Sequence, residues 1–260
     1  MSDTINFRSP KTLGCSVASS AIIQSLREKF QKSEIIVYTK TPDLFIGLTE
    51  IDKLVDLNNE IRPANYDVDL EDYLDVTKPQ STEPFRHLID HMFEISEKQL
   101  ESQLPGRLNR NFKPKVNLGS EEITWAKDTV VTLSHGKPLI WIQTKSGLEE
   151  KDAPTALWQE LISRCSDKYS FIDLSQGQCS RRQAIAITQA ATGGITLDTF
   201  LLHGSEAVHA RNVIVLLVSS HREVVCYPDQ ICLTYSVDSY SHTVDGIINA
   251  LDNCIQTLNI

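Results

Sequence analysis

An α/β fold is indicated first by the stretch Gly193-Gly-Ile-Thr-Leu-Asp-Thr-Phe-Leu-Leu-His203 and by the run Val213-Ile-Val-Leu-Leu-Val218 that follows it. Residues 194–197 and 213–218 are short apolar runs, which are typical of strands buried on both faces of a parallel sheet. A helical segment that starts at Asp198 lies between them. A strand, a helix and a second strand in this order predict a parallel α/β sheet.

The same alternation extends over the rest of the chain. A glycine-containing turn at residues 12–16 is followed by apolar residues at helical spacing, and a second series of strands and helices begins after residue 137. We place the domain boundary between residues 127 and 137, with one domain at residues 1–130 and the other at 131–260. Strands are expected at residues 4–7, 34–39, 52–57, 66–70, 139–143, 169–174, 194–197 and 213–218, helices at 85–104, 158–165, 180–191 and 243–258 and from residues 120 and 198, and a surface loop at 71–83.

Composition excludes several classes of protein. The chain has 260 residues, of which 41% are hydrophobic and 23% charged, so a packed core is expected and a disordered or fibrous chain is not. The net charge of −9 would repel a nucleic acid. No apolar run reaches the roughly 20 residues that span a bilayer, and the first residues do not resemble a signal peptide. We therefore expect a cytoplasmic protein.

The six cysteines are scattered and form no C-x-x-C motif. In a reducing compartment they are most simply free thiols. Cys226 and Cys232 could be grouped with His203, His209 and His221 as metal ligands, but no pair has the spacing of a structural zinc site. We therefore expect no metal.

Small polar residues follow several of the predicted strands. These loops are residues 14–20, residues 144–147 with Lys151, residues 198–203 and residues 219–221. Backbone N–H groups at the start of a helix are free to hold an anion. One such loop alone more often only caps its helix, as it does in any doubly wound α/β protein.

Four of these segments together resemble family 9 glycosyltransferases, the heptosyltransferase-like enzymes. Residues 14–26 with Arg27-Glu-Lys-Phe30 look like the opening of that family. The segment Lys151-Asp-Ala-Pro154 is similar to its Lys-Arg-Trp-Pro segment, residues 193–203 resemble its Asp-[Ser/Thr]-x-x-x-His signature, and Ser219-Ser-His-Arg-Glu223 stands where the family has a Gly-x-Thr/Ser turn.

The resemblance implies the GT-B fold, with two Rossmann-like domains facing a central cleft and a nucleotide-sugar donor of the ADP-sugar type held mainly by the carboxyl-terminal domain. A diphosphate needs a helix N-terminus and a cation, which the helix at Asp198 and the ammonium of Lys151 would supply without a metal or another cofactor. We expect Asp198 to cap this helix and His203 to meet the phosphate or the sugar. The expected donor-binding residues are Thr144, Lys145, Ser146, Lys151, Asp198, Thr199, His203, Ser219 and Ser220.

Two departures from the family concern the amino-terminal half. Cys15 occupies the position of the family's catalytic aspartate, and a thiol is a poor substitute for a carboxylate base. The nearest alternative carboxylate that we select is Asp69, in the acidic end of the strand at residues 66–70. Family members are also usually longer, so the resemblance implies an abbreviated amino-terminal domain and makes a homo-oligomer an expectation.

The leading prediction is a metal-independent inverting glycosyltransferase. It would transfer a heptose-like sugar from a nucleotide diphosphate donor to an unidentified glycan or protein acceptor. The alternative is a non-catalytic nucleotide-sugar-binding or scaffold subunit that has lost the base, and a sugar-nucleotide epimerase on the same fold is a third reading. Cys15 is the residue that separates the first two hypotheses.

Overall fold

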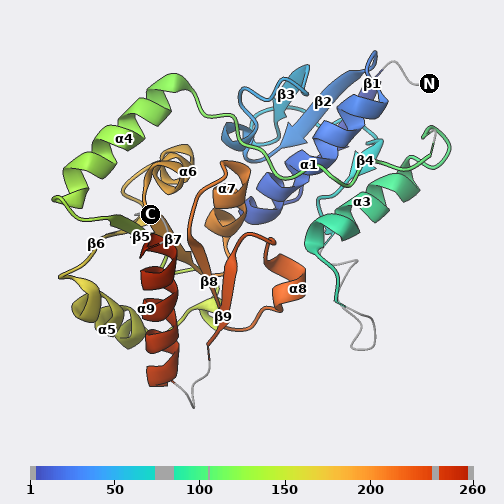
Figure 1. Ribbon diagram of the computed structural model, residues 1–260. Helices are drawn as coiled ribbons and strands as arrows, with labels where there is room; N and C mark the ends of the chain where they lie inside the picture. The colour runs from blue at the N-terminus through green and yellow to red at the C-terminus, as the bar shows by residue number, and fades with distance from the viewer. Residues whose placement is uncertain (1–3, 74–84, 105, 236–239, 257–260) are drawn as a thin grey trace. The chain divides into compact units, whose positions relative to one another are not determined.

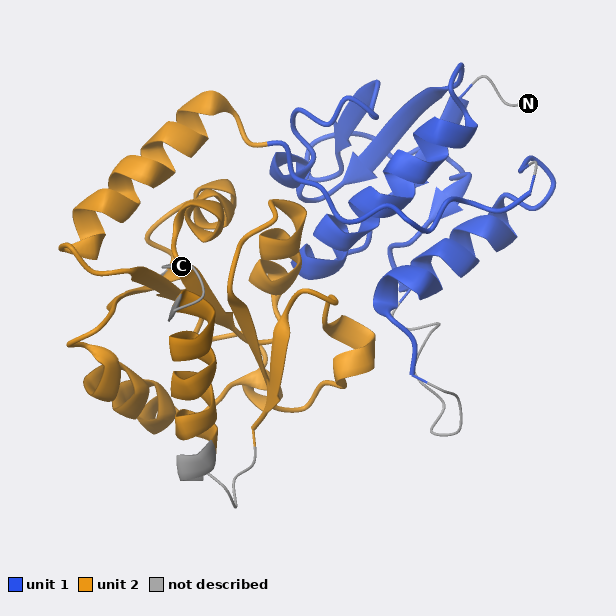
Figure 2. Cartoon of the chain, in the orientation of Figure 1, with its two compact units in different colours: residues 1–117 blue, residues 118–260 orange. Residues whose placement is uncertain are grey.

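The computed structural model describes residues 4–73, 85–104, 106–235 and 240–256. The chain divides into two compact units, residues 1–117 and 118–260 (Figure 2). The division falls before the helix at residues 120–134, whereas the sequence suggested a boundary inside it, between residues 130 and 131. Most of the surface loop expected at 71–83 lies outside the described residues.

Unit 1 contains a sheet of four parallel strands in the order β3-β2-β1-β4. Two longer helices accompany the sheet and pack against each other. The elements of unit 1 are β1 (Thr4–Arg8), α1 (Leu13–Lys29), β2 (Glu34–Thr39), the 3₁₀ turn η1 (Pro42–Leu44), β3 (Lys53–Asp56), β4 (Val68–Asp69) and α3 (Leu88–Gln99).

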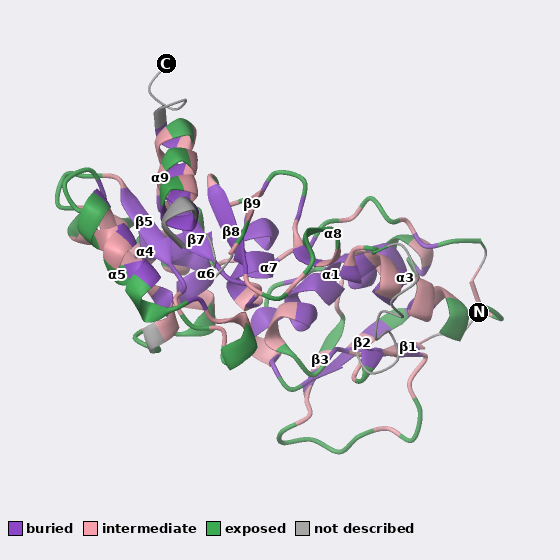
Figure 3. Ribbon diagram, turned by 90° about the horizontal axis from the view of Figure 1, so that it is seen from below, coloured by how far each residue is buried: buried purple, intermediate pink, exposed green. Residues whose placement is uncertain are grey.

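Burial alternates along the strands of unit 1. Ile5 and Phe7 of β1 are fully buried, while Asn6 and Arg8 between and after them are half-buried. The period of two means that one face of this sheet is packed, and α1 and α3 lie on that side (Figure 3). The other face leaves polar side chains within reach of solvent.

Unit 2 contains five parallel strands in the order β6-β5-β7-β8-β9. Its strands are β5 (Leu139–Ile142), β6 (Ser170–Asp173), β7 (Gly193–Thr196), β8 (Val213–Leu217) and β9 (Ile231–Thr234). Its helices are α4 (Ser120–Ser134), α5 (Thr155–Cys165), α6 (Arg181–Ala190), α7 (Phe200–Ala207), α8 (Arg222–Val225) and α9 (Tyr240–Gln256), with 3₁₀ turns η2 (Glu149–Lys151) and η3 (Leu174–Gln176).

Helices cover both faces of the unit 2 sheet (Figure 1). On one face, apolar residues of β5, β7 and β8 form a core with α5 and α9. On the other, α4 packs on α6 and α6 on α7. Trp141 is fully buried, and its ring lies so close to Gly194 that a Cβ at that position would be 1.8 Å from it. The glycine therefore leaves room for the indole beside the neighbouring strand.

The predicted α/β class with parallel strands is confirmed, with local differences. The helix expected from Asp198 begins at Phe200, whereas the helix expected from residue 120 does begin at Ser120, with Gly119 as its N-cap. The sequence did not predict β9 or α8. In the described part of the chain, no helix is both long and apolar enough to cross a membrane.

Both sheets have a point at which the strand order reverses direction. This point lies between β1 and β4 in unit 1, and between β5 and β7 in unit 2. In open parallel sheets, ligands bind at the carboxyl ends of the strands at such a point, because the loops there diverge. The residues that follow β1, β4, β5 and β7 are therefore the first place to look for a site.

Candidate functional site

One carboxylate joins three loops at the carboxyl edge of the unit 2 sheet. Lys151 Nζ donates to Asp198 Oδ2 at 2.6 Å, and the hydroxyl of Ser220 donates to the same oxygen at 2.5 Å. Lys151 comes from the connection after β5, Asp198 from that after β7 and Ser220 from that after β8. The structure thus brings three of the expected donor-binding residues together at the point where the strand order reverses.

Asp198 is largely buried, and its charge is stabilised by these partners. Burial raises the pKa of Asp198, but the positive charge of Lys151, the hydrogen bonds from Lys151 and Ser220 and the charge of His203 together lower that pKa below its ordinary value. Asp198 is therefore an anion at neutral pH. The side chain of Lys151 remains 28% exposed, so its ammonium can also face a ligand.

Asp198 does not cap α7, contrary to the expectation from the sequence. The N-cap is Thr199, and its hydroxyl donates to the side-chain oxygen of Gln143 rather than accepting from the helix. Thr196 donates to the same oxygen at 3.2 Å. The side chain of the N-cap residue makes no hydrogen bond to the start of α7. The first backbone N–H groups of a helix have no partner within the helix, so this end of α7 favours the binding of an anion.

His203 lies one turn into α7 and is 3% exposed. Its Nδ1 is 2.8 Å from the hydroxyl of Tyr227, in the segment between α8 and β9. The charge of His203 acts on Asp198, so the ring lies near the three joined loops. Tyr227 was not selected from the sequence.

The other expected residues after β5 form a separate group. The hydroxyl of Thr144 donates to Asp173 at 2.7 Å, at the end of β6. Ser146 donates to Asp152 through its N–H at 2.6 Å and its hydroxyl at 2.8 Å, and Lys145 pairs with the same carboxylate at 3.2 Å. These contacts shape the loop. Ser219 is exposed beside Ser220.

Cys15 lies inside the first turn of α1, not in the turn before the helix. Its side chain is buried, and its Sγ is 2.9 Å from the hydroxyl of Tyr73. The structure therefore places the thiol against a phenol. Cys15 and Asp69 are not partners of each other in any contact among the described residues.

Asp69 lies across the strand reversal of unit 1 from Arg8. The guanidinium of Arg8 forms a two-pronged pair with its carboxylate, with Nε donating to Oδ1 at 2.7 Å, and Arg8 also pairs with Glu71 at 2.6 Å. The hydrogen bond from Arg8 to Asp69 raises the pKa of the guanidinium more than burial lowers it. A pocket of about 510 Å³ opens here, and it is lined by Arg8, Asp69, Asp72, Tyr73, Ile95, Lys98 and Gln99.

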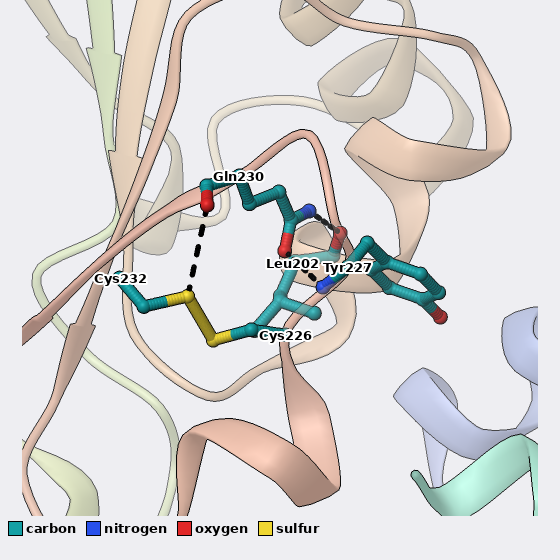
Figure 4. The surroundings of a disulfide bond; sticks show 5 residues. All are labelled: Leu202, Cys226, Tyr227, Gln230 and Cys232. Carbon is teal, nitrogen blue, oxygen red and sulfur yellow. Dashed lines mark hydrogen bonds between the residues drawn. A yellow bond between two sulfur atoms is a disulfide. The ribbon is translucent and has the colours of Figure 1, made fainter.

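The structure corrects the expectation that all cysteines are free thiols. Cys226 and Cys232 form a disulfide (Figure 4), whereas Cys15, Cys165, Cys179 and Cys254 are not disulfide-bonded. The two sulfurs considered as metal ligands are therefore joined to each other. No group of three or more histidine, cysteine or acidic residues in the described segments could hold a metal ion.

Comparison with known proteins identifies the fold. No protein-family model matches the chain, and no curated protein matches it either. Among solved structures, the ADP-heptose lps heptosyltransferase II of E. coli matches with a TM-score of 0.73 at 14% identity, over 99% of this chain and 100% of that one. The chain has the fold of the heptosyltransferases.

Two further structures agree. A family 9 glycosyltransferase from Veillonella parvula DSM 2008 matches with a TM-score of 0.72 at 13% identity, over 99% of this chain and 98% of that one. The E. coli heptosyltransferase WaaC with ADP matches with a TM-score of 0.64 at 12% identity, over 96% of this chain and 99% of that one. Because these alignments span nearly the whole of each chain, they give no support to an abbreviated amino-terminal domain.

Several residues of the two sites were missed by the sequence analysis. Arg8 directly follows a predicted strand, so its position at the sheet edge was a usable signal. The sequence carried no signal for Tyr73, Gln143 and Tyr227, because each contacts a residue that is distant in the chain. Tyr73 is 58 residues from Cys15, and Tyr227 is 24 residues from His203.

Proposed function

We propose that this protein is an inverting glycosyltransferase of the heptosyltransferase type. It would transfer a heptose-like sugar from an ADP-sugar donor to an unidentified glycan or protein acceptor without a metal ion. A cytoplasmic location and self-association belong to the same proposal. The observation that carries it is the contact of Lys151 and Ser220 with the carboxylate of Asp198, at the point where the strand order of the unit 2 sheet reverses. The fold, which is that of the heptosyltransferases, supports it.

In this proposal unit 2 holds the donor. An ammonium has three N–H donors, and Asp198 uses one of those of Lys151. The remaining two, with the uncapped N–H groups at the start of α7, would hold the diphosphate. Asp198 would hold the ammonium in an orientation that faces the ligand. Thr144, Lys145, Ser146 and Ser219 would line the edges of the same site.

Unit 1 would bind the acceptor and would supply the general base. The pocket beside Asp69 has carboxylates, a guanidinium, an amide and an aromatic ring, which suit an acceptor rich in hydroxyl groups. In the transfer step, the acceptor hydroxyl gives its proton to Asp69 while its oxygen attacks the anomeric carbon from the face opposite the diphosphate. The bond to the diphosphate breaks, and its electron pair leaves with ADP, whose charge Lys151 would stabilise.

We assign the base to Asp69 rather than to Cys15. Asp69 faces a pocket, whereas the thiol of Cys15 is buried against Tyr73. A neutral thiol with an ordinary pKa of about 8.5 is also a weak base at neutral pH. Arg8 would hold the Asp69 carboxylate in place.

The first test of this proposal is ADP binding. Isothermal titration calorimetry should show that ADP binds the wild-type protein, and that Lys151→Met weakens binding by roughly tenfold, the loss expected for one charge-assisted contact. The matched control is Lys127→Met, which removes an exposed lysine from α4. If ADP fails to bind at millimolar concentration, or if the two variants behave alike, the donor site is not the one proposed.

The second test separates an enzyme from a binding subunit. Release of ADP from ADP-heptose, with a set of glycan acceptors, should fall by about 10²- to 10⁴-fold in Asp69→Asn, because a general base contributes a factor of that size. ADP affinity should stay unchanged, and Cys15→Ser should keep its activity. Binding of the donor with no turnover by the wild type would favour the non-catalytic alternative.

A further inference from the structure

We propose that Tyr227 is a positioning residue that holds the neutral imidazole of His203 in the tautomer with its proton on Nε2. This inference rests on the proposed function, because it concerns how His203 would face the diphosphate. It starts from the 2.8 Å contact between the Tyr227 hydroxyl and His203 Nδ1. No feature of the sequence assigns a role to Tyr227.

The contact is buried and well defined. His203 is 3% exposed and Tyr227 is 6% exposed. Their rings meet edge to face, with centroids 5.7 Å apart and planes at 86°. Because water has little access to either ring, the Tyr227 hydroxyl stays the partner of Nδ1. Whether that hydroxyl donates or accepts decides which nitrogen of the neutral ring carries the imidazole proton.

The segment that carries Tyr227 is fastened to α7 by a second contact. The side-chain amide of Gln230 donates to the carbonyl oxygen of Leu202 at 3.2 Å, next to His203 in the chain. The N–H of Tyr227 donates to the side-chain oxygen of Gln230 at 3.1 Å. The disulfide between Cys226 and Cys232 closes the segment at both ends (Figure 4). The phenol is therefore held in place by its own loop and not only by the histidine.

The chemistry of the two groups selects the tautomer. A phenol is a better hydrogen-bond donor than acceptor, whereas an unprotonated imidazole nitrogen is a strong acceptor. With the hydroxyl donating to Nδ1, the imidazole proton resides on Nε2. A diphosphate has only acceptor oxygens, so the Nε2–H tautomer can donate to it and the other tautomer cannot. Tyr227 would thus let a neutral histidine act as a donor at physiological pH.

Charged and titratable groups face His203 from several elements of unit 2. Asp198 acts on it from the β7–α7 connection, with Lys151 bound to that carboxylate. Tyr227 faces it from the α8–β9 segment. Glu206 lies on its own helix, and α6 meets α7 with Ile185 against Gly204. Asp198 attracts a protonated imidazole, and a protonated ring has an N–H on both nitrogens.

A pH-dependent comparison tests the inference. The tautomer of His203 is read from the ¹⁵N signals of its ring at pH 8, without ligand, in the wild type and in Tyr227→Phe. We expect Nε2–H in the wild type and a mixture of tautomers in the variant. ADP affinity of Tyr227→Phe should fall roughly threefold to tenfold at pH 8, as for one hydrogen bond. It should fall much less at a lower pH at which the ¹⁵N signals show the imidazolium, because that form donates from either nitrogen.

The control is Tyr235→Phe, which removes a hydroxyl at the end of β9 and should change neither the tautomer nor the affinity. A wild-type His203 with its proton on Nδ1 overturns the inference, and this measurement needs neither a folded variant nor ADP. An equal loss of affinity at both pH values also overturns it, since that is what a purely structural role produces. Failure of the wild type to bind ADP overturns the donor site instead.

Discussion

Lys151 and Asp198 were both selected from the sequence as groups that meet a diphosphate, and the structure pairs them with each other. Their atoms are 2.6 Å apart, and the side chain of Asp198 is 12% exposed. An ion pair at this depth costs desolvation, so it is weak evidence for stability alone. Its more specific effect is to hold an ammonium at the edge of the sheet in one orientation.

Removal of one partner should therefore cost more than removal of both. Lys151→Met leaves a buried carboxylate without its cation and should lower the free energy of unfolding by about 2 kcal/mol. The double variant Lys151→Met with Asp198→Asn should recover at least about 1 kcal/mol of the summed single losses, because no charge is then stranded. Urea unfolding at pH 7 measures this coupling. Additive losses would show that the pair is only a surface contact.

Individual contacts were the least predictable level of the structure. The motif at residues 198–203 and Lys151 could be found because small and charged residues after strands mark a sheet edge. The pairing of Arg8 with Asp69 and of His203 with Tyr227 could not, since each depends on how two strands or loops are placed side by side. The disulfide of Cys226 and Cys232 was missed because two cysteines separated by 6 residues do not form a recognised motif.

Strands and helices were predicted well where they are long and apolar. The runs at residues 139–143 and 213–218 lie in the middle of a sheet and carry a continuous apolar signal, and both are strands. β9 was missed because it is a four-residue strand at the edge of the sheet, in which Ile231, Cys232 and Leu233 are half-buried and Thr234 is exposed. The strand expected at 66–70 is only Val68–Asp69, and beside it the side chain of Asp67 accepts the backbone N–H of Asn6 at 2.8 Å.

The helix α4 shows how a side-chain contact assigns an element to a unit. Glu122 accepts two hydrogen bonds at 2.6 Å from Arg182 of α6, and it also accepts the N–H of Gly119 at 2.8 Å. These contacts tie α4 to unit 2, which is why the division falls before this helix. The hydrogen bond from Arg182, opposed by burial and assisted by that from Gly119, holds the pKa of Glu122 below its ordinary value.

That lowered pKa predicts a pH-dependent contribution to stability. A carboxylate with a lower pKa in the folded state stabilises the protein above its unfolded pKa of about 4.5, and this stability is lost as the pH falls through the folded value. Glu122→Gln should therefore lower the free energy of unfolding by about 1–2 kcal/mol at pH 7 and by much less near pH 3.

The matched control for this prediction is Glu121→Gln. It removes a charge from the same helical turn, but Glu121 is exposed and makes no ion pair with any described residue. Chemical denaturation of both variants at the two pH values gives the comparison. A loss for Glu122→Gln that is the same at pH 3 as at pH 7 would show that packing, and not the carboxylate charge, fastens α4.

Across the whole molecule, the same arrangement occurs in each unit. A charged pair joins the strand ends at both reversals of strand order, Arg8 with Asp69 in unit 1 and Lys151 with Asp198 in unit 2. The parallel topology produces both places, because the carboxyl ends of adjacent strands meet at one edge. The topology could be expected from the alternation of strands and helices, whereas the use of a cation and a carboxylate at both reversals could not.

Unit 2 should fold and bind ADP without unit 1. Its sheet and the core around Ile140, Ile195 and Leu216 consist entirely of residues after 118, and the proposed donor residues lie in the same unit. A fragment of residues 118–260 should therefore unfold in one cooperative transition, seen by circular dichroism, and bind ADP in calorimetry. The same fragment with Lys151→Met is the control and should bind at least several-fold more weakly. A folded fragment that does not bind ADP would mean that unit 1 contributes to the donor site, whereas a fragment without a cooperative transition would mean that the core of unit 2 depends on residues before 118.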